Sequence, residues 1–501
     1  LSAFLSDYFA IRYVGRHSSS NLPLYLKVSA LWAGQEGSLL LWSALQALFT
    51  ALAVARPSKL ARPLVLWATF FLSLITAFFV LATLISTPFA QLTPAPHEGQ
   101  GLNPLLRHPG MIFHPPILYI GYVGLAVPFA FAMAALVTHN VRTWTRAVHP
   151  WTLSAWLGLG GGILLGMRWA YDVLGWGGYW GWDPVENAGL LPWLTTTALL
   201  HGAVMQEERR GFHTWNLMLV IVSFLLVLFG TFATRSGAIQ SVHAYTQSKL
   251  GGYFLAGIGV TFIGALGLLL RWARSRRTLE QRPSQSEEED TLFSQDGMFF
   301  LTLLLLCTLT ASVFVGTLLP TITEQLLNRR LSAGPKWFNR VTGPQFAALV
   351  LVMGVCPLLG RTVQAYQRRK SKATAGYSQS APYGRHWLWI GGLGTAVSLL
   401  LALILLDFTK LLSLLGIAIV GFTGALSVAN TIREVISHHQ RTNVILNTVS
   451  GLSADEGHPP TLNIADLLHT LWHLLRTQRR KYGGYLVHLG VTLMAVGVIG
   501  T

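Results

Sequence analysis

The chain has 501 residues, of which 52% are hydrophobic and only 11% are charged, and its mean hydropathy is +0.48. Soluble domains contain roughly 25% charged residues, so the composition excludes an ordinary soluble protein and indicates a membrane protein. The net charge of +16 is explained by membrane topology, and we expect no nucleic-acid partner.

Apolar runs long enough to cross a hydrocarbon core as helices recur along the chain. They predict an all-α, polytopic membrane helix bundle with about twelve transmembrane helices. No methionine stands at position 1 and the last run stops abruptly, so we expect a trimmed form of a longer protein. The first 37 residues leave room for part of another helix. The expected spans are approximately residues 38–55, 63–86, 111–137, 151–171, 188–206, 214–234, 250–271, 298–319, 345–360, 387–406, 411–430 and 482–501.

Lysine and arginine residues are distributed unevenly over the loops between these spans. If the loop with Arg56, Lys59 and Arg62 is cytoplasmic and the spans alternate, 24 of the 36 basic residues lie on the cytoplasmic side. Basic residues concentrate on that side in membrane proteins, so the bias supports this orientation. The opposite, periplasm-like face then carries the loop between the fourth and fifth spans.

That loop contains an unusually aromatic stretch, residues 175–193, which reads GWGGYWGWDPVENAGLLPW. Trp176, Tyr179, Trp180 and Trp182 fall within seven residues of one another. Glycine allows tight turns and close approach to a flat ligand, and indole faces offer rigid apolar surface, so the stretch suits a platform for an extended aromatic molecule. A tryptophan belt at the membrane interface is an equal alternative.

The same stretch has the pattern of a helix start. Asp183 stands at an N-cap position, Pro184 at the first helical position and Glu186 three residues after the cap. In this arrangement two side chains satisfy free N–H groups of the first helical turn. Asp183 can cap the helix and still orient a ligand, so both roles stay open.

Two histidines lie inside predicted spans at matching depths. His201 is about 20 Å below the outer end of its span, and His488 is about 9 Å above the inner end of the last span. In a core roughly 30 Å thick these depths coincide, so the pair can ligate one iron from opposite sides. An ionisable side chain within lipid indicates function by default. The alternative is a separate interhelical hydrogen bond from each histidine.

A second pair of histidines is predicted at the outer face. His114 precedes Pro115 and Pro116 at the entrance of the third span, and His243 lies just beyond the sixth span. His108 is on the same face, and we favour His114 over it as a ligand. Because carboxylate and thiolate clusters with zinc spacing are absent from the sequence, haem is favoured over a bare metal ion.

The inner side carries polar linkers and one amphipathic segment. Residues 462–481 contain IADLLHTLWHLL, which predicts a structural helix on the inner membrane surface. Cys307 and Cys356 lie within apolar runs and form no CxxC motif. They therefore indicate neither a disulfide framework nor a thiol redox motif.

Taken together, these residues resemble the CcmF-type cytochrome c haem lyases over nearly the whole chain. WGGYWGWDPVEN is similar to the WWD signature of a haem-handling superfamily that also includes the CcmC and CcsA types. The further matches are LWAGQEGSLLLW, HPGMIFHPPILYIGYVG, TRSGAIQSVHA and RRKYGGYLVHLG. The first and last of these, with the chain length, favour the CcmF type.

The resemblance implies a role for each candidate residue. His201 and His488 match the pair that holds a resident haem b. His114 and His243 match the pair that ligates the iron of an incoming haem. The platform and catalytic positions are implied at Trp176, Trp180, Trp182 and Asp183, and the haem-binding stretch extends to Glu186 and Asn187.

The resemblance also implies a location and an organisation. The chain is expected in a bacterial plasma (inner) membrane, with its active face toward the periplasm. The expected parts are haem-handling helices at 1–272 with the WWD segment at 172–193, a polar cytoplasmic linker at 273–297, further transmembrane helices at 298–430, a cytoplasmic linker with an amphipathic surface helix at 431–481, and a transmembrane helix at 482–501.

The implied reaction is the addition of the two thiols of an apocytochrome Cys-x-x-Cys-His motif to the haem vinyl groups. The implied partners are a haem chaperone of the CcmE type, apocytochrome c, proteins of the CcmH, CcmI and CcmG types, and membrane lipids. A haem-reducing activity, with the resident haem as relay and a quinol as donor, is a further expectation. Two rivals are a haem transporter, which would form no thioether product, and a quinol-oxidising haem b electron-transfer subunit, in which the tryptophan platform would be dispensable.

Overall fold

The structure is a computed structural model. It describes residues 1–55, 62–173, 178–209, 212–241, 250–279, 295–373, 384–405, 411–449 and 463–499. Within these ranges the chain is helical, and the sole β pairing is an isolated bridge between Ile11 and Gln91. The predicted all-α class is confirmed. The chain forms two compact units, Leu1–Glu287 with Leu303–Thr342, and Glu288–Thr302 with Gly343–Thr501.

Ten helices in the described part of the chain are long and apolar enough to cross a membrane. The other two expected spans, 151–171 and 387–406, fall on the helices α8 and α14. The protein is therefore a multi-pass helical membrane protein. The described helices of the first unit are α4 (Gln35–Ala55), α5 (Arg62–Ile85), α6 (Gly110–Gly124), α7 (Ala126–Val137), α8 (Trp144–Val173), α9 (Pro184–Arg209), α10 (His213–Arg235) and α11 (Leu250–Leu279), followed by α12 (Gln295–Leu327) and α13 (Pro335–Ala373), which both units share.

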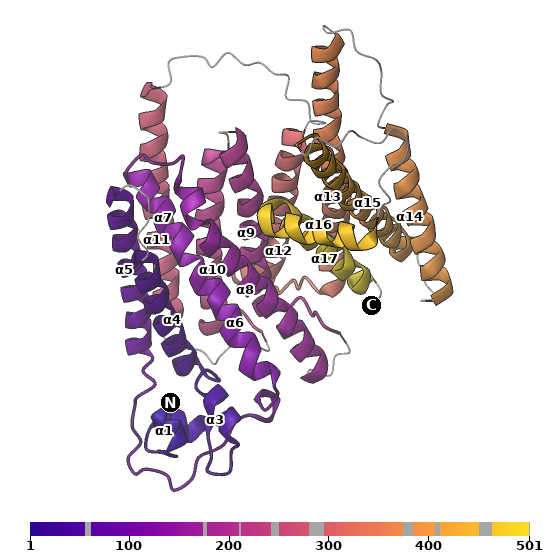
Figure 1. Ribbon diagram of the computed structural model, residues 1–501. Coiled ribbons are helices and arrows are strands. Elements are labelled where there is room, and N and C mark those ends of the chain that lie inside the picture. Colours follow the sequence, from indigo (N-terminus) through magenta and orange to yellow (C-terminus); the bar gives the residue numbers. More distant parts are fainter. Residues whose placement is uncertain are drawn as a thin grey trace. The chain divides into compact units, whose positions relative to one another are not determined.

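Glycines bring α6 and α8 into close contact, and Figure 1 shows the two helices side by side. Gly158, Gly162 and Gly166 follow one another at four-residue spacing along α8. A Cβ atom on Gly158 would lie 2.6 Å from the backbone nitrogen of Gly121, and one on Gly162 would lie 2.7 Å from the Cα of Leu118. Small residues at this spacing let helix backbones approach in membranes. The crossing therefore leaves no room for side chains at these positions.

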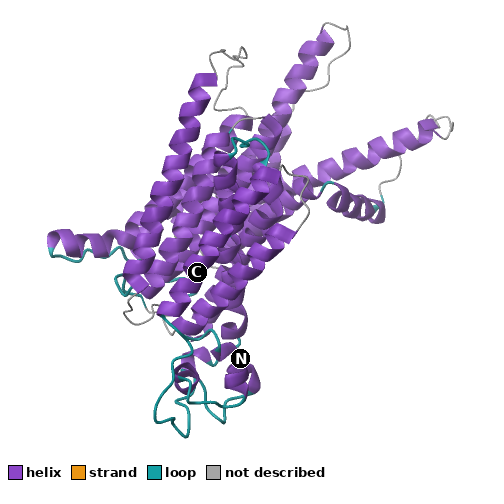
Figure 2. Cartoon of the chain, turned by 90° about the vertical axis from the view of Figure 1, so that its left-hand side faces the viewer, coloured by secondary structure: helices purple, strands orange, loops and turns teal. Residues whose placement is uncertain are grey.

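A small N-terminal lobe, residues 1–34 and 86–109, covers one end of this bundle (Figures 1 and 2). It contains α1 (Ser2–Leu5), α2 (Arg12–His17), α3 (Leu24–Ala30) and the short 3-10 turn η1 (Pro104–Leu106). Its core consists of buried apolar side chains from both segments. Backbone bonds from Arg12 to Ala90 (2.8 Å) and from Gln100 to Gly15 (2.7 Å) join the two segments. Residues 1–34 thus form part of a lobe with three short helices, and residues 35–37 begin α4.

Two ionisable groups of the lobe have altered acidity. Burial of His17, whose Nδ1 lies 2.9 Å from the carbonyl oxygen of Tyr13, lowers the pKa of its imidazole. Hydrogen bonds from the hydroxyl and backbone N–H of Ser20 lower the pKa of the Glu98 carboxyl. The folded lobe is therefore more stable when both groups are deprotonated.

The second unit contains α14 (Gly384–Leu405), α15 (Leu411–Val449), α16 (Ile464–Thr477) and α17 (Arg479–Ile499). The predicted amphipathic segment forms α16. Its residue Leu474 is fully buried against Val435 and Tyr482, while Ile464 and Trp472 are exposed on the other side. The helix therefore packs on α15 and α17 and keeps a second apolar stripe uncovered within this unit.

Candidate functional site

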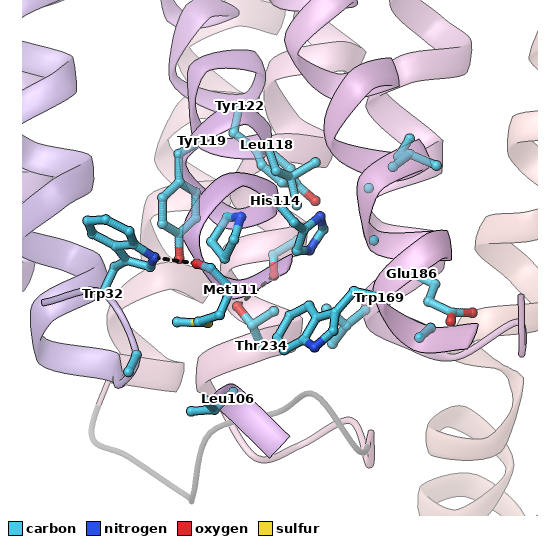
Figure 3. A pocket seen from close by; sticks show the side chains of 18 of the residues that line it. Trp32, Leu106, Met111, His114, Leu118, Tyr119, Tyr122, Trp169, Glu186 and Thr234 are labelled. Atoms are coloured by element: carbon cyan, nitrogen blue, oxygen red, sulfur yellow. Dashed lines mark hydrogen bonds between the residues drawn. The ribbon is translucent and has the colours of Figure 1, made fainter. Parts of the chain in front are cut away.

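A cavity of about 420 Å³ lies at the lobe end of the first unit. Helices α4, α6, α8, α9 and α10 and the N-terminal lobe all contribute to its walls. Figure 3 shows Trp32, His114 and Trp169 around the same space. Pockets that hold flat, largely apolar ligands have volumes of roughly 300–1,000 Å³. The cavity is therefore large enough to take a substantial part of a porphyrin.

His114, one of the predicted ligands, lines this cavity. It lies in the second turn of α6, which begins at Gly110, one residue before the expected span 111–137. Its Nδ1 is 2.7 Å from the carbonyl oxygen of Gly162. A carbonyl only accepts, so Nδ1 carries the proton and Nε2 carries the lone pair. This is the tautomer that a histidine uses when Nε2 ligates a metal.

The glycine stripe of α8 sets the position of this imidazole. A Cβ atom on Gly166 would lie 2.7 Å from Cε1 of His114. The ring of Trp169 packs 5.7 Å from the imidazole, centroid to centroid. The imidazole is thus held by a backbone carbonyl, a glycine surface and an indole, all from α8. The signal for this arrangement was present in the sequence as the glycine spacing, and sequence reasoning missed it.

His108, the alternative ligand, does not line the cavity. Its Nδ1 accepts a hydrogen bond of 3.1 Å from the backbone N–H of Gly110. Its Nε2 lies 3.6 Å from a carboxylate oxygen of Asp172. Both ring nitrogens of His108 therefore face groups of the protein, and the geometry favours His114 as the ligand.

The tryptophan segment, residues 178–187, divides its side chains between the cavity and the neighbouring helix α13. Trp180 lines the cavity and meets Trp182 edge to face at 5.9 Å. Trp182 stacks on Phe338 of α13 at 4.8 Å, with an angle of 4° between the rings. Its Nε1 donates to Oδ1 of Asn339 at 2.8 Å. Trp182 therefore anchors the segment, and Trp180 is the tryptophan of this segment that lines the cavity.

The predicted capping pattern is formed at the start of α9. Asp183 accepts a bond of 3.0 Å from the backbone N–H of Val185, and Glu186 accepts one of 3.1 Å from the backbone N–H of Asp183. The hydroxyl of Ser241 also donates a hydrogen bond to the carboxylate of Asp183. Glu186 also lines the cavity. Glu186 therefore combines capping with a place in the cavity wall.

Asn187 is fully buried behind the segment. Its amide nitrogen donates to the carbonyl of Trp182 at 3.2 Å and to the hydroxyl of Thr317 at 3.0 Å. Trp182 has a φ of +56°, a conformation that a tryptophan adopts only when its surroundings hold it. Asn187 and Asp183 therefore fix the backbone of the segment instead of lining the cavity.

Three cavity residues were not singled out from the sequence. Arg235, at the end of α10, is 2% exposed and donates to the hydroxyls of Ser38 (2.9 Å) and Thr234 (3.0 Å). Tyr122 lies in the wall near Gly230, where a Cβ atom would come within 3.3 Å of its hydroxyl oxygen. Trp42 packs on the Tyr119 and Tyr122 rings. These residues lie on three different helices, so their convergence has no local sequence pattern.

The other predicted histidines are placed as follows. His201 lies in α9, outside the cavity lining, with Nδ1 2.8 Å from the carbonyl of Thr197. His488 lies in α17, in the second unit. Their pairing stays a prediction. Trp176 and His243 lie outside the described residues.

Comparisons with known proteins agree on one group. Residues 32–240 match the family model described as cytochrome C assembly protein. The chain is 40% identical over 390 residues to the cytochrome c-type biogenesis protein CycK of Rhizobium meliloti, covering 76% of this chain and 56% of that protein. It is 40% identical over 362 residues to the cytochrome c-type biogenesis protein CcmF of Escherichia coli, covering 72% of this chain and 55% of that protein.

A solved structure is also similar. The cytochrome c heme lyase CcmF matches with a TM-score of 0.68 and 29% identity, over 99% of this chain and 67% of that one. The chain thus spans little more than half the length of the two curated relatives. The cavity falls entirely within the family match, because its lining residues run from Trp32 to Arg235.

Proposed function

Because this chain belongs to the CcmF-type family of cytochrome c biogenesis proteins, we propose that it takes part in attaching haem covalently to apocytochrome c as a haem lyase. The observation that carries the proposal is the cavity itself. It combines a histidine of the metal-ligating tautomer with indole surfaces, and it lies within the part of the chain that matches the family. A haem needs both features, an axial ligand and a flat apolar surface.

In the proposed reaction each of two cysteine thiols of the apocytochrome adds across one haem vinyl group. The sulfur bonds to the vinyl carbon next to the ring, and the thiol hydrogen ends on the terminal carbon, so no electron is gained or lost overall. Haem supplies the reacting vinyl groups, and the protein has to bind and orient them. Holding the haem in one orientation turns the encounter with the peptide into a prealigned reaction.

The side chains would divide this work between them. His114 would ligate the iron through Nε2, and His243 is the proposed second ligand. Trp180, with Trp176, would support the porphyrin face. Trp182, Asp183 and Asn187 would hold the segment in place through the contacts with Phe338, Val185 and Thr317. Glu186 would do both, since it caps α9 and lines the cavity.

A second haem, a resident haem b, is proposed between His201 and His488. The bond from Nδ1 of His201 to a backbone carbonyl fits an axial ligand that uses Nε2. Such a haem would supply one-electron chemistry, and with a quinol as donor it would keep the incoming iron ferrous. Absorbance spectra of the purified protein, with each histidine replaced in turn, test this assignment separately from the cavity.

The proposed setting is a bacterial inner membrane with the lobe end toward the periplasm. Haem would arrive from a chaperone of the CcmE type. Apocytochrome c, kept reduced by partners of the CcmG and CcmH types and presented by a CcmI type, would approach the same face. On this account the substrate's own histidine displaces one iron ligand, which releases the product.

Complementation in cells that lack their own CcmF-type protein tests the proposal. We expect His114→Ala to reduce holocytochrome c at least tenfold, since the iron loses a ligand. His108→Ala, at a histidine outside the cavity, is the matched control and should keep most of the yield. Equal yields from both variants at equal expression would contradict the assignment.

A further inference from the structure

Two of the stretches that carry the family resemblance meet at one corner of the cavity. LWAGQEGSLLLW contributes Ser38 and Trp42, and TRSGAIQSVHA contributes Thr234 and Arg235. Nη2 of Arg235 donates to Oγ of Ser38 at 2.9 Å, and Nη1 donates to Oγ1 of Thr234 at 3.0 Å. The guanidinium carbon lies 6.0 Å from the centre of the Trp42 ring. The proposed histidine and tryptophan roles leave this corner unexplained.

Arg235 is held in place by a built network. The hydroxyl of Ser38 donates in turn to the carbonyl of Gln35 at 2.8 Å, so its lone pairs are directed to the guanidinium. The bonds to Ser38 and Thr234 fix the guanidinium, and the side chain is 2% exposed while it lines the cavity. Placing a cation inside a membrane protein is costly, and such residues mark binding sites by default.

A second donor lies at the same corner. Trp42 is only 2% exposed. Its buried indole Nε1 has no hydrogen-bond partner within the described residues. A buried donor without an acceptor costs free energy unless a ligand supplies one. A cation and an indole N–H at one cavity corner both suit an anionic ligand group with oxygen acceptors. Arginine in particular binds carboxylates through two parallel bonds.

We propose that Arg235, fixed by Ser38 and assisted by Trp42, binds the carboxylate edge of the ligand in this cavity. The inference rests on the proposed function, under which that ligand is haem and the carboxylates are its propionates. Propionates and vinyl groups occupy different edges of haem. Anchoring the propionates between α4 and α10 turns the vinyl groups away from this wall, so Arg235 determines the orientation in which the thiols meet them. Arg235 is a positioning residue for the reaction.

The experiment compares two probes, iron protoporphyrin IX and its dimethyl ester, in which the propionates carry no charge. Both are titrated into the purified full chain by visible absorbance, and the preference is the ratio of the two dissociation constants. We expect the wild-type chain to prefer the free acid roughly ten- to a hundredfold, as for hydrogen bonds to charged groups. Arg235→Gln should abolish the preference, and Arg235→Lys should retain part of it. Trp42→Phe, which removes only the N–H, should lower it a few-fold.

Arg168→Gln is the matched control, because Arg168 lies on α8 outside the cavity and pairs with Asp172 at 2.9 Å. It should keep the wild-type preference. The preference is a ratio within one variant, so partial loss of folded protein does not alter it, and Ser38→Ala provides a second variant if Arg235→Gln is not recovered. An undiminished preference in Arg235→Gln, or equal binding of both probes by the wild type, would overturn this inference alone. Binding of neither probe by the wild type would overturn the proposed function with it.

Discussion

The two walls on either side of the cavity hold their side chains by different means. The α6–α8 wall positions His114 by backbone proximity, since three glycines of α8 admit no Cβ atom without a close contact. The tryptophan segment positions Trp180 through side-chain bonds and ring stacking, from Asp183, Asn187 and Trp182 to α9, α12 and α13. The α6–α8 wall should therefore be sensitive to added side-chain volume, and the tryptophan segment to the loss of polar or aromatic groups.

The largest effect is expected from volume added to the glycine wall. Gly158→Ala would place a Cβ atom 2.6 Å from the backbone nitrogen of Gly121, where no flexible side chain can yield. Overpacking of this kind costs about 1–3 kcal/mol, and we expect a value near the upper end. Gly161→Ala is the control, because its Cβ atom would meet only a side-chain carbon of Ile117 at 3.6 Å. Thermal unfolding in detergent measures both, and equal losses would show that the crossing tolerates volume.

Removal of an aromatic group should affect the second wall. Trp182→Ala loses the stack on Phe338 and the bond to Asn339, together worth about 1–3 kcal/mol. Trp182→Phe keeps a ring to stack and should lose less than half of this. The same unfolding assay separates them. If both variants lose equally, the hydrogen bond and not the stack fixes the segment.

Removal of the helix cap should have a smaller effect. Asp183→Ala removes the acceptor of the Val185 N–H, a change that typically costs about 1 kcal/mol. Asp183→Asn keeps a side-chain acceptor at the N-cap and should be nearly as stable as the wild type. Haem titration of the two variants then isolates the binding role. A loss of haem affinity in Asp183→Asn at unchanged stability would give Asp183 a role beyond capping.

The smallest effect is expected from pH, and it should be confined to the N-terminal lobe. The folded-state pKa of His17 is lowered by burial, so the stability from its neutral form is present above its ordinary value of 6.5 and is lost as the pH falls below it. The lowered pKa of Glu98 acts in the same direction at more acidic pH. Hydrogen exchange at pH 7.5 and 5.5 should show faster opening of residues 10–18, with the α6–α8 crossing unchanged. His17→Phe should remove the change, and its persistence would assign the effect elsewhere.

Local patterns in the sequence predicted the positions of the helices and of the α9 cap, because both depend on residues close together in the chain. In their described residues, eleven of the twelve expected spans each fall on one helix, and the span 111–137 is divided between α6 and α7. Hydrophobic length sets where a chain can cross lipid, so these spans were readable from the sequence. The capping pair Asp183 and Glu186 was also visible, since its bonds join residues two or three apart. The amphipathic pattern of the segment 462–481 was also readable from the sequence, and its residues Ile464–Thr477 form α16.

The cavity could not be predicted from local sequence patterns. Arg235 meets Ser38 across 197 positions, and Trp182 meets Asn339 across 157, so no periodicity records either contact. The glycine spacing of α8 was readable, but its consequence for His114 depends on which helix packs there. The sequence favoured His114 over His108 as the ligand, and the packing of Asp172 and of the Gly162 carbonyl supplies the contacts that distinguish them.

Chemical rescue tests whether His114 ligates the iron of a haem in this cavity. Purified wild-type chain and the variant His114→Gly each receive one equivalent of ferric haem, and difference absorbance spectra report its coordination. We predict that the variant loses the histidine-ligated spectrum of the added haem and regains it when free imidazole is supplied. An unchanged spectrum in His114→Gly, with no response to imidazole, would contradict the account.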